Sequence, residues 1–101
     1  LRRLKEEGEE PLRLLGALSW QFALLARAFF LLRENPRPKE EDLARLEAHP
    51  YAAKKALEAA RRLTEEALKE ALDALMEGEK RAKGGNDPWL ALEAAVLRLA
   101  R

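Results

Sequence analysis

Cysteine is absent from the 101 residues of this chain, and histidine occurs once, as His49. The lack of cysteine excludes disulfide bonds, thiol nucleophiles and cysteine-based zinc sites, and it is compatible with a cytoplasmic protein. A catalytic or metal site would have to be built almost wholly from carboxylates. Because His49 directly precedes Pro50, we interpret it as a helix-capping residue rather than a metal ligand or a catalytic base.

Residues with β-branched side chains are nearly absent too, with one valine, one threonine and no isoleucine. Alanine, leucine, glutamate, arginine and lysine dominate the composition, and these residues favour helices. We therefore predict an all-α fold, a five-helix bundle with a long central helix.

Neither sign of charge is in excess, because 19 lysines and arginines are balanced by 18 aspartates and glutamates. No overall field attracts nucleic acid or an anionic membrane, so any such contact depends on a local patch. No signal peptide is visible. The chain begins with LRRLKEEGEE and no initiator methionine. We interpret residues 1–8 as the end of a helix or a linker from a preceding domain, and residues 9–101 as one helical domain.

The chain is organised around residues 12–33, an apolar helix that is predicted to end near Glu34 because prolines follow at positions 36 and 38. Its apolar residues form two adjacent stripes. One stripe consists of Leu15, Leu18, Phe22, Leu25, Phe29 and Leu32, and the other of Leu14, Ala17, Leu24, Ala28 and Leu31. The remaining face still carries Trp20, Arg27 and Phe30, which we predict to be a subunit interface.

Two alternatives remain open for this helix. The first is a membrane span, but the uncharged run covers only residues 14–26 between Arg13 and Arg27, whereas a span needs about 20 apolar residues. We therefore expect no membrane insertion. In the second, the last helix of the chain covers the face of Trp20 and Phe30, through Trp89 and Leu90.

Four further helices are predicted. A short helix at residues 39–46 should lie on the surface, and Pro50 begins the next helix. Thr64 caps a helix that ends at Gly78 or soon after, or that continues for another turn before Gly84. Asp87 and Pro88 begin the last helix. The residues predicted to face inward include Tyr51, Ala53, Ala56, Leu57 and Ala60, then Ala67, Leu68, Leu72, Leu75 and Met76. In the last helix, the predicted stripe consists of Trp89, Leu92, Val96 and Leu99, with Leu90 and Leu97 beside it.

We predict no catalytic, cofactor-binding or metal-binding residues. The one serine, Ser19, has no histidine near it in the sequence to act as a base. The Gly84-Gly85 turn lacks the spacing of a phosphate-binding loop and the Lys-Ser/Thr pair that follows it. A row of acidic residues shares one helix face: Glu66, Glu70, Asp73 and Glu77. Without a Glu-x-x-His motif, this row is interpreted as a solvated or partner-facing surface.

A basic cluster is the remaining candidate for binding, and it consists of Lys54, Lys55, Arg61 and Arg62. The short helix, a tight turn at residues 47–49 and the helix from Pro50 have the lengths of a helix-turn-helix, so a DNA-binding domain is the alternative function. Ala53 and Ala56 favour packing over base contact. We expect the cluster to contact a neighbouring protein of an assembly or the neighbouring acidic helix, and to bind DNA only weakly and without sequence preference.

Two motifs resemble a known family. The run HPYAAKK occupies residues 49–55, and KGGNDPWLALE occupies residues 83–93. With the apolar helix before them, they resemble the C-terminal domain of the delta subunit of bacterial DNA polymerase III, from Gly8 to the end of the chain. Trp20 and Glu47 depart from the pattern, because the family more often has a polar or basic residue at the first position and a small or apolar one at the second.

The resemblance implies a part in the clamp loader, the ATP-driven machine that opens the sliding clamp and places it on primed DNA. It implies that this domain joins a circular collar with the gamma/tau and delta prime subunits, without a cofactor and without catalysis. The sliding clamp would be bound only by an N-terminal portion outside this chain, and contact with DNA would be indirect or weak. The parent protein would belong to the DNA polymerase III holoenzyme, which has nucleotidyltransferase activity.

Overall fold

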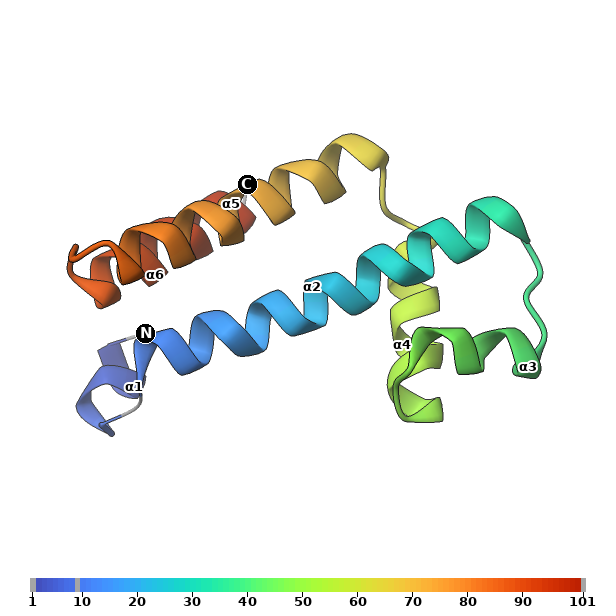
Figure 1. Ribbon diagram of the computed structural model, residues 1–101, viewed down its shortest axis with the longest axis horizontal. Coiled ribbons are helices and arrows are strands. Elements are labelled where there is room, and N and C mark those ends of the chain that lie inside the picture. Colours follow the sequence, from blue (N-terminus) through green and yellow to red (C-terminus); the bar gives the residue numbers. More distant parts are fainter. Residues whose placement is uncertain (1, 9, 101) are drawn as a thin grey trace. The chain divides into compact units, whose positions relative to one another are not determined.

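The computed structural model describes residues 2–8 and 10–100, without the side chains of Arg2 and Leu4. Leu1, Glu9 and Arg101, which fall within the predicted domain boundaries, lie outside the described residues. Helices dominate the described part of the chain, which contains no strand, so the predicted all-α fold is confirmed (Figure 1). The chain divides into two compact units: unit 1 comprises residues 1–20 and 69–101, and unit 2 comprises residues 21–68.

Unit 2 is built from the second half of α2 (Pro11–Glu34), α3 (Glu40–Leu43), the 3-10 helix η1 (Ala44–Leu46) and α4 (Pro50–Ala60). Its core consists of Leu24, Ala28, Leu31, Leu46, Ala53, Ala56, Leu57 and Ala60. Half of these residues are alanines, so the helix backbones can approach closely.

The two predicted stripes of α2 are not buried equally in unit 2. Leu24, Ala28 and Leu31 are at most 5% exposed. Phe22 and Leu25, which belong to the other stripe, are only half-buried. The alanine-rich face of α4 packs on the stripe that contains Ala28, because that stripe offers the smaller side chains.

Two predictions in unit 2 are wrong. The segment with Leu46 was expected on the surface, yet Leu46 is 1% exposed. The chain tightens into η1 here, and residues three apart on a 3-10 turn point the same way, so Leu46 follows Leu43 toward the core. Tyr51 was expected inside but is 67% exposed. It precedes the buried Ala53 by two residues, which places it on the opposite side of α4.

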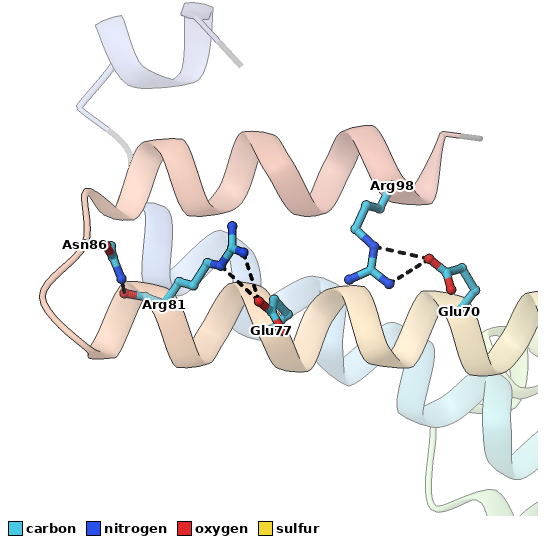
Figure 2. A network of polar contacts seen from close by, with 5 residues as sticks. All are labelled: Glu70, Glu77, Arg81, Asn86 and Arg98. Atoms are coloured by element: carbon cyan, nitrogen blue, oxygen red, sulfur yellow. Dashed lines mark hydrogen bonds and ion pairs between the residues drawn. The ribbon is translucent and has the colours of Figure 1, made fainter.

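Unit 1 is built from α1 (Arg2–Glu6), the first half of α2, α5 (Glu65–Lys83) from residue 69 onward, and α6 (Pro88–Leu99). In Figures 1 and 2, α5 and α6 run antiparallel and side by side, joined by a short turn. Buried residues of this unit include Leu15, Ala74, Leu75, Ala82, Ala91, Leu92 and Ala95.

Gly78 is a packing residue and does not end a helix. A Cβ at this position would lie 3.2 Å from the Cβ of Ala95 and 3.3 Å from Cδ2 of Leu15. The glycine therefore lets α2, α5 and α6 meet closely. The helix ends instead after Lys83, where Gly85 has a φ of 92° and the N–H of Asn86 donates to the carbonyl of Arg81 at 3.2 Å, as in a Schellman motif.

Close packing at Gly78 also decides which side of α6 faces inward. On α5, Ala67 and Met76 were expected inside, but both are exposed, Met76 by 71%. On α6, Leu90 and Leu97, which lie beside the predicted stripe, are 64% and 71% exposed. The side of α6 that faces inward carries Ala91, Leu92 and Ala95 instead, because small side chains fit against Gly78. Leu90 and Leu97 are each two positions from one of these residues, and this spacing turns them outward.

The predicted helix starts are confirmed. The side chain of His49 accepts a hydrogen bond from the N–H of Tyr51 at 3.1 Å, and Asp87 accepts one from the N–H of Trp89 at 2.9 Å. Oγ1 of Thr64 accepts from the N–H of Ala67 at 3.1 Å. Each side chain satisfies a backbone donor that has no partner within its helix.

Helix α2 is long and apolar enough to cross a membrane by length and composition alone. One such helix is weak evidence for a membrane protein, because the core helix of a soluble protein passes the same test. Only 22% of its most apolar window is buried within the chain. The helix therefore retains apolar surface that the described residues do not cover.

Gly16 and Gly78 offer matched substitutions in helix interiors of unit 1. A Cβ at Gly16 would meet nothing within 4 Å, so Gly16→Ala should raise the free energy of unfolding by about 0.8–1 kcal/mol. Gly78→Ala gains the same helix propensity but displaces Ala95 and Leu15, and we expect it to be at least about 1 kcal/mol less favourable. Urea unfolding of the chain measures both. Equal stabilisation by the two variants would contradict the close helix contact.

Leu31 and Leu25 test which stripe of α2 forms the core. Leu31 is 4% exposed, so Leu31→Ala should lower the free energy of unfolding by about 2–5 kcal/mol. Leu25 is half-buried, and Leu25→Ala should cost less. Denaturant unfolding of the two variants gives the comparison. If Leu25→Ala were the more damaging change, the assignment of the inward face would be reversed.

Candidate subunit interface

Phe30 and Arg27, two of the three predicted interface residues, lie together on α2 in unit 2. Phe30 is 51% exposed, and its ring meets that of Phe29 edge-on, with ring centroids 5.6 Å apart. Nη1 of Arg27 donates to the carbonyl of Leu46 at 2.8 Å. Arg27 thus holds the end of η1 against α2, a structural role that its sequence position did not reveal.

A groove of about 250 Å³ runs beside these two residues. It is lined by Ala26, Arg27, Phe30, Leu31, Glu34, Arg45 and Leu46. Arg45 and Glu34 form an ion pair at its rim, with 3.1 Å between Nη2 and Oε2. The side chains of Arg45 and Glu34 are 60% and 61% exposed. Sequence reasoning missed the contribution of η1, because a periodic pattern does not indicate how a short 3-10 turn folds back on a helix.

Trp20, the third predicted residue, lies on α2 within unit 1 and is 52% exposed. The alternative was that the last helix covers this aromatic face through Trp89 and Leu90. Leu90 is itself 64% exposed, and Trp20 keeps half of its surface open. Both large aromatic residues of the predicted interface are therefore accessible in the described part of the chain.

The predicted basic cluster lies on and after α4. Lys54, Lys55, Arg61 and Arg62 are all exposed. Nζ of Lys55 lies 5.6 Å from the centre of the Tyr51 ring, and Nη1 of Arg61 donates to the carbonyl of Pro36 at 3.2 Å. These contacts give two of the four residues local partners. Lys54 also lines a pocket of about 200 Å³ whose other lining residues include Glu40, Leu43 and Pro50.

The segment proposed as a helix-turn-helix has a sharp turn but a poor first helix. Glu47 has a φ of 53°, the left-handed conformation in which a small residue is favoured. The helix α3 has four residues, and its first turn carries Glu40, Glu41 and Asp42. These carboxylates would face unfavourable charge near a phosphate backbone. Ala53 and Ala56 are buried, as expected for packing residues.

The acidic row on α5 takes part in contacts within unit 1 (Figure 2). The guanidinium of Arg98 on α6 reaches Glu70 on α5, with 2.6 Å between Nη2 and Oε1. This hydrogen bond, with the charges of Glu70, Asp73 and Glu77, raises the pKa of Arg98 above its usual value. Arg98 therefore stays charged until the pH exceeds that raised value, and the contact with Glu70 is maintained at neutral pH.

Unit 1 has further polar contacts, both local ones at the end of α5 and one between helices. Arg81 pairs with Glu77 on the same helix at 3.0 Å, and the carbonyl of Arg81 accepts from the side chain of Asn86 at 3.2 Å (Figure 2). Oγ of Ser19 donates to the carboxylate of Glu79, so the serine serves packing between α2 and α5. Within residues 2–8 and 10–100, no three His, Asp or Glu side chains gather as metal ligands.

Comparison with known proteins agrees with the two sequence motifs. The family model for the DNA polymerase III delta subunit, C-terminal domain, matches residues 1–99. DNA polymerase III subunit delta of Bacillus subtilis (strain 168) is 29% identical over 100 residues, which cover 97% of this chain and 28% of that relative. The chain thus spans less than a third of the relative's length. No solved structure matches it. The chain belongs to the family formed by the C-terminal domain of the DNA polymerase III delta subunit.

Proposed function

We propose that this domain assembles the delta subunit into the collar of the clamp loader, and so supports loading of the sliding clamp onto primed DNA. The observation that carries the proposal is the accessible apolar surface of α2, where Trp20 and Phe30 are 52% and 51% exposed. Exposed aromatic side chains are enriched where a protein meets a partner. The C-terminal domain of delta is a non-catalytic accessory domain, so its contribution is an interaction.

The partners in this proposal are the gamma/tau and delta prime subunits. A ring of unlike neighbours uses heterologous contacts, in which each protein presents a different patch to each side. The sliding clamp would be held by other parts of the delta subunit, of which this chain corresponds to a fraction. The full-length protein would work in the cytoplasm as part of the DNA polymerase III holoenzyme.

The residue types on the accessible face favour contact with another protein. Tryptophan and arginine are enriched among residues whose truncation weakens binding most, and phenylalanine is enriched at interfaces. Both residues of unit 2 on this face have contacts within the chain, since the ring of Phe30 lies edge-on to Phe29 and Arg27 donates to the carbonyl of Leu46. A side chain that is already ordered loses little conformational entropy when a partner covers it.

Phe30→Ala and Trp20→Ala in the full-length delta subunit should each weaken incorporation into the clamp loader, by about 2 kcal/mol for a central contact. Their melting temperatures should stay near that of the parent, because half of each side chain is exposed. Arg27→Ala should weaken assembly less and also lose the hydrogen bond to Leu46. Size-exclusion chromatography with the gamma/tau and delta prime subunits measures assembly.

Leu97→Ala is the control, since Leu97 is also a large apolar residue and is 71% exposed but lies on α6, outside the proposed contacts. It should assemble normally. Normal assembly of Phe30→Ala and Trp20→Ala would contradict the proposal. A melting temperature that falls together with assembly would assign this face to the domain's own core.

The basic cluster gives a separate prediction for DNA. The chain should bind a labelled duplex only weakly, with a Kd in the non-specific range of about 10⁻⁴–10⁻⁶ M at physiological salt. Replacing both Lys54 and Lys55 by Ala should weaken this binding to the same degree for every duplex sequence. Fluorescence anisotropy measures it. Sequence-selective binding tighter than about 10⁻⁸ M would favour the helix-turn-helix function instead.

A further inference from the structure

The groove beside Phe30 has an unusual balance of charge for an apolar surface. Its lining includes the apolar residues Ala26 and Leu31 and the exposed ring of Phe30. Leu46 also lines the groove, and the charged lining residues are two arginines and one glutamate: Arg27, Arg45 and Glu34. The carboxylate of Glu34 is paired with Arg45 at 3.1 Å, so it offsets one positive charge and leaves the groove with a net charge of about +1 by this count.

Arg27 carries the charge that remains. One of its five N–H groups donates to the carbonyl of Leu46 at 2.8 Å. A carbonyl oxygen satisfies a hydrogen bond but supplies no negative charge, so the guanidinium is oriented without being neutralised. An oriented arginine next to an apolar surface is the arrangement that recognises a carboxylate with two parallel hydrogen bonds.

We propose that this groove receives an acidic side chain set beside an apolar one, presented by a neighbouring protein of the assembly. The apolar side chain covers Phe30 and Leu31, and the carboxylate meets Arg27 and Arg45. This inference rests on the proposed function, because it names the chemistry of the partner that the accessible face of α2 would bind. A basic or wholly apolar partner would leave the positive charge of the groove unpaired in the contact.

The ion pair at the rim allows a test that separates charge recognition from structure. Arg45→Gln and Glu34→Gln break the same ion pair. If that pair had only a structural role, both substitutions would change the affinity for the partner in the same direction. If the groove recognises a carboxylate, the two substitutions change the affinity in opposite directions, because Arg45→Gln removes a positive charge and Glu34→Gln removes a negative one. Exposed ion pairs contribute little to stability, so both variants should fold.

The measurement is the Kd of the full-length delta subunit for the purified gamma/tau and delta prime subunits, by isothermal titration calorimetry. Arg45→Gln should weaken binding and Glu34→Gln should strengthen it, each by about two- to fivefold, as for a partly exposed charge pair. The gap between them should close between about 0.1 M and about 1 M salt, as the screening length falls from about 10 Å to about 3 Å.

Arg33→Gln is the matched control for the loss of a positive charge. Arg33 also lies on α2, but it pairs with Glu65 and does not line the groove. Its variant loses an exposed ion pair as Arg45→Gln does, without changing the charge of the groove. Binding by Arg33→Gln should therefore stay within about twofold of the parent.

Different failures have different meanings. Equal effects of Arg45→Gln and Glu34→Gln, together with weakened binding by Phe30→Ala, would overturn the acidic partner and leave the proposed function standing. Stronger binding by Arg45→Gln together with weaker binding by Glu34→Gln would overturn the acidic partner in favour of a basic one. The full-length protein alone could also form dimers that dissociate in the Arg45→Gln variant. That result would assign the groove to a second copy of this chain and would also overturn the acidic partner. Normal binding by Phe30→Ala would contradict the proposed function itself.

Discussion

The constraint on which the structure depends is that α2 has more apolar surface than so short a chain can cover. The helix has 24 residues and carries large apolar side chains on every face. In unit 2, only the stripe with Leu24, Ala28 and Leu31 becomes fully buried. The alanines of α4 share one buried cluster with this stripe, and Phe30 lies outside that cluster. Exposure of Phe30 on another face is the direct consequence.

Those features of the fold that depend on local chemistry could be predicted from the sequence. Prolines and capping side chains define where helices begin, because a missing N–H and a side-chain acceptor both suit the first turn. His49 and Asp87 behave in this way, and so does the stop after Lys83, where a glycine takes a left-handed conformation. Helix existence follows from composition, since few β-branched residues compete with it.

Packing partners could not be predicted in the same way. From the sequence alone, Gly78 suggests the end of a helix. A Cβ there would crowd Ala95 and Leu15, so the role of this glycine depends on two other helices. The pattern around Leu46 indicates a surface helix, and only the tightening of the backbone into a 3-10 turn carries this side chain inward. The candidate site shows the same division. Phe30 and Trp20 are identified by the helical period, whereas the groove needs Arg45 and Leu46, which a periodic pattern on α2 cannot supply.

In the proposed interface, the residues assigned to recognition differ from those that stabilise the domain, with one exception. In unit 1, α6 is held by the close contact at Gly78, and the Arg98–Glu70 pair adds little because both side chains are partly exposed. In unit 2 the core is alanine and leucine, whereas the accessible face holds Phe30, Glu34 and Arg45. Arg27 alone does both, since it holds Leu46 and lines the groove. A partner that engages Arg27 therefore also acts on the position of η1, so binding and the local order of this turn are coupled.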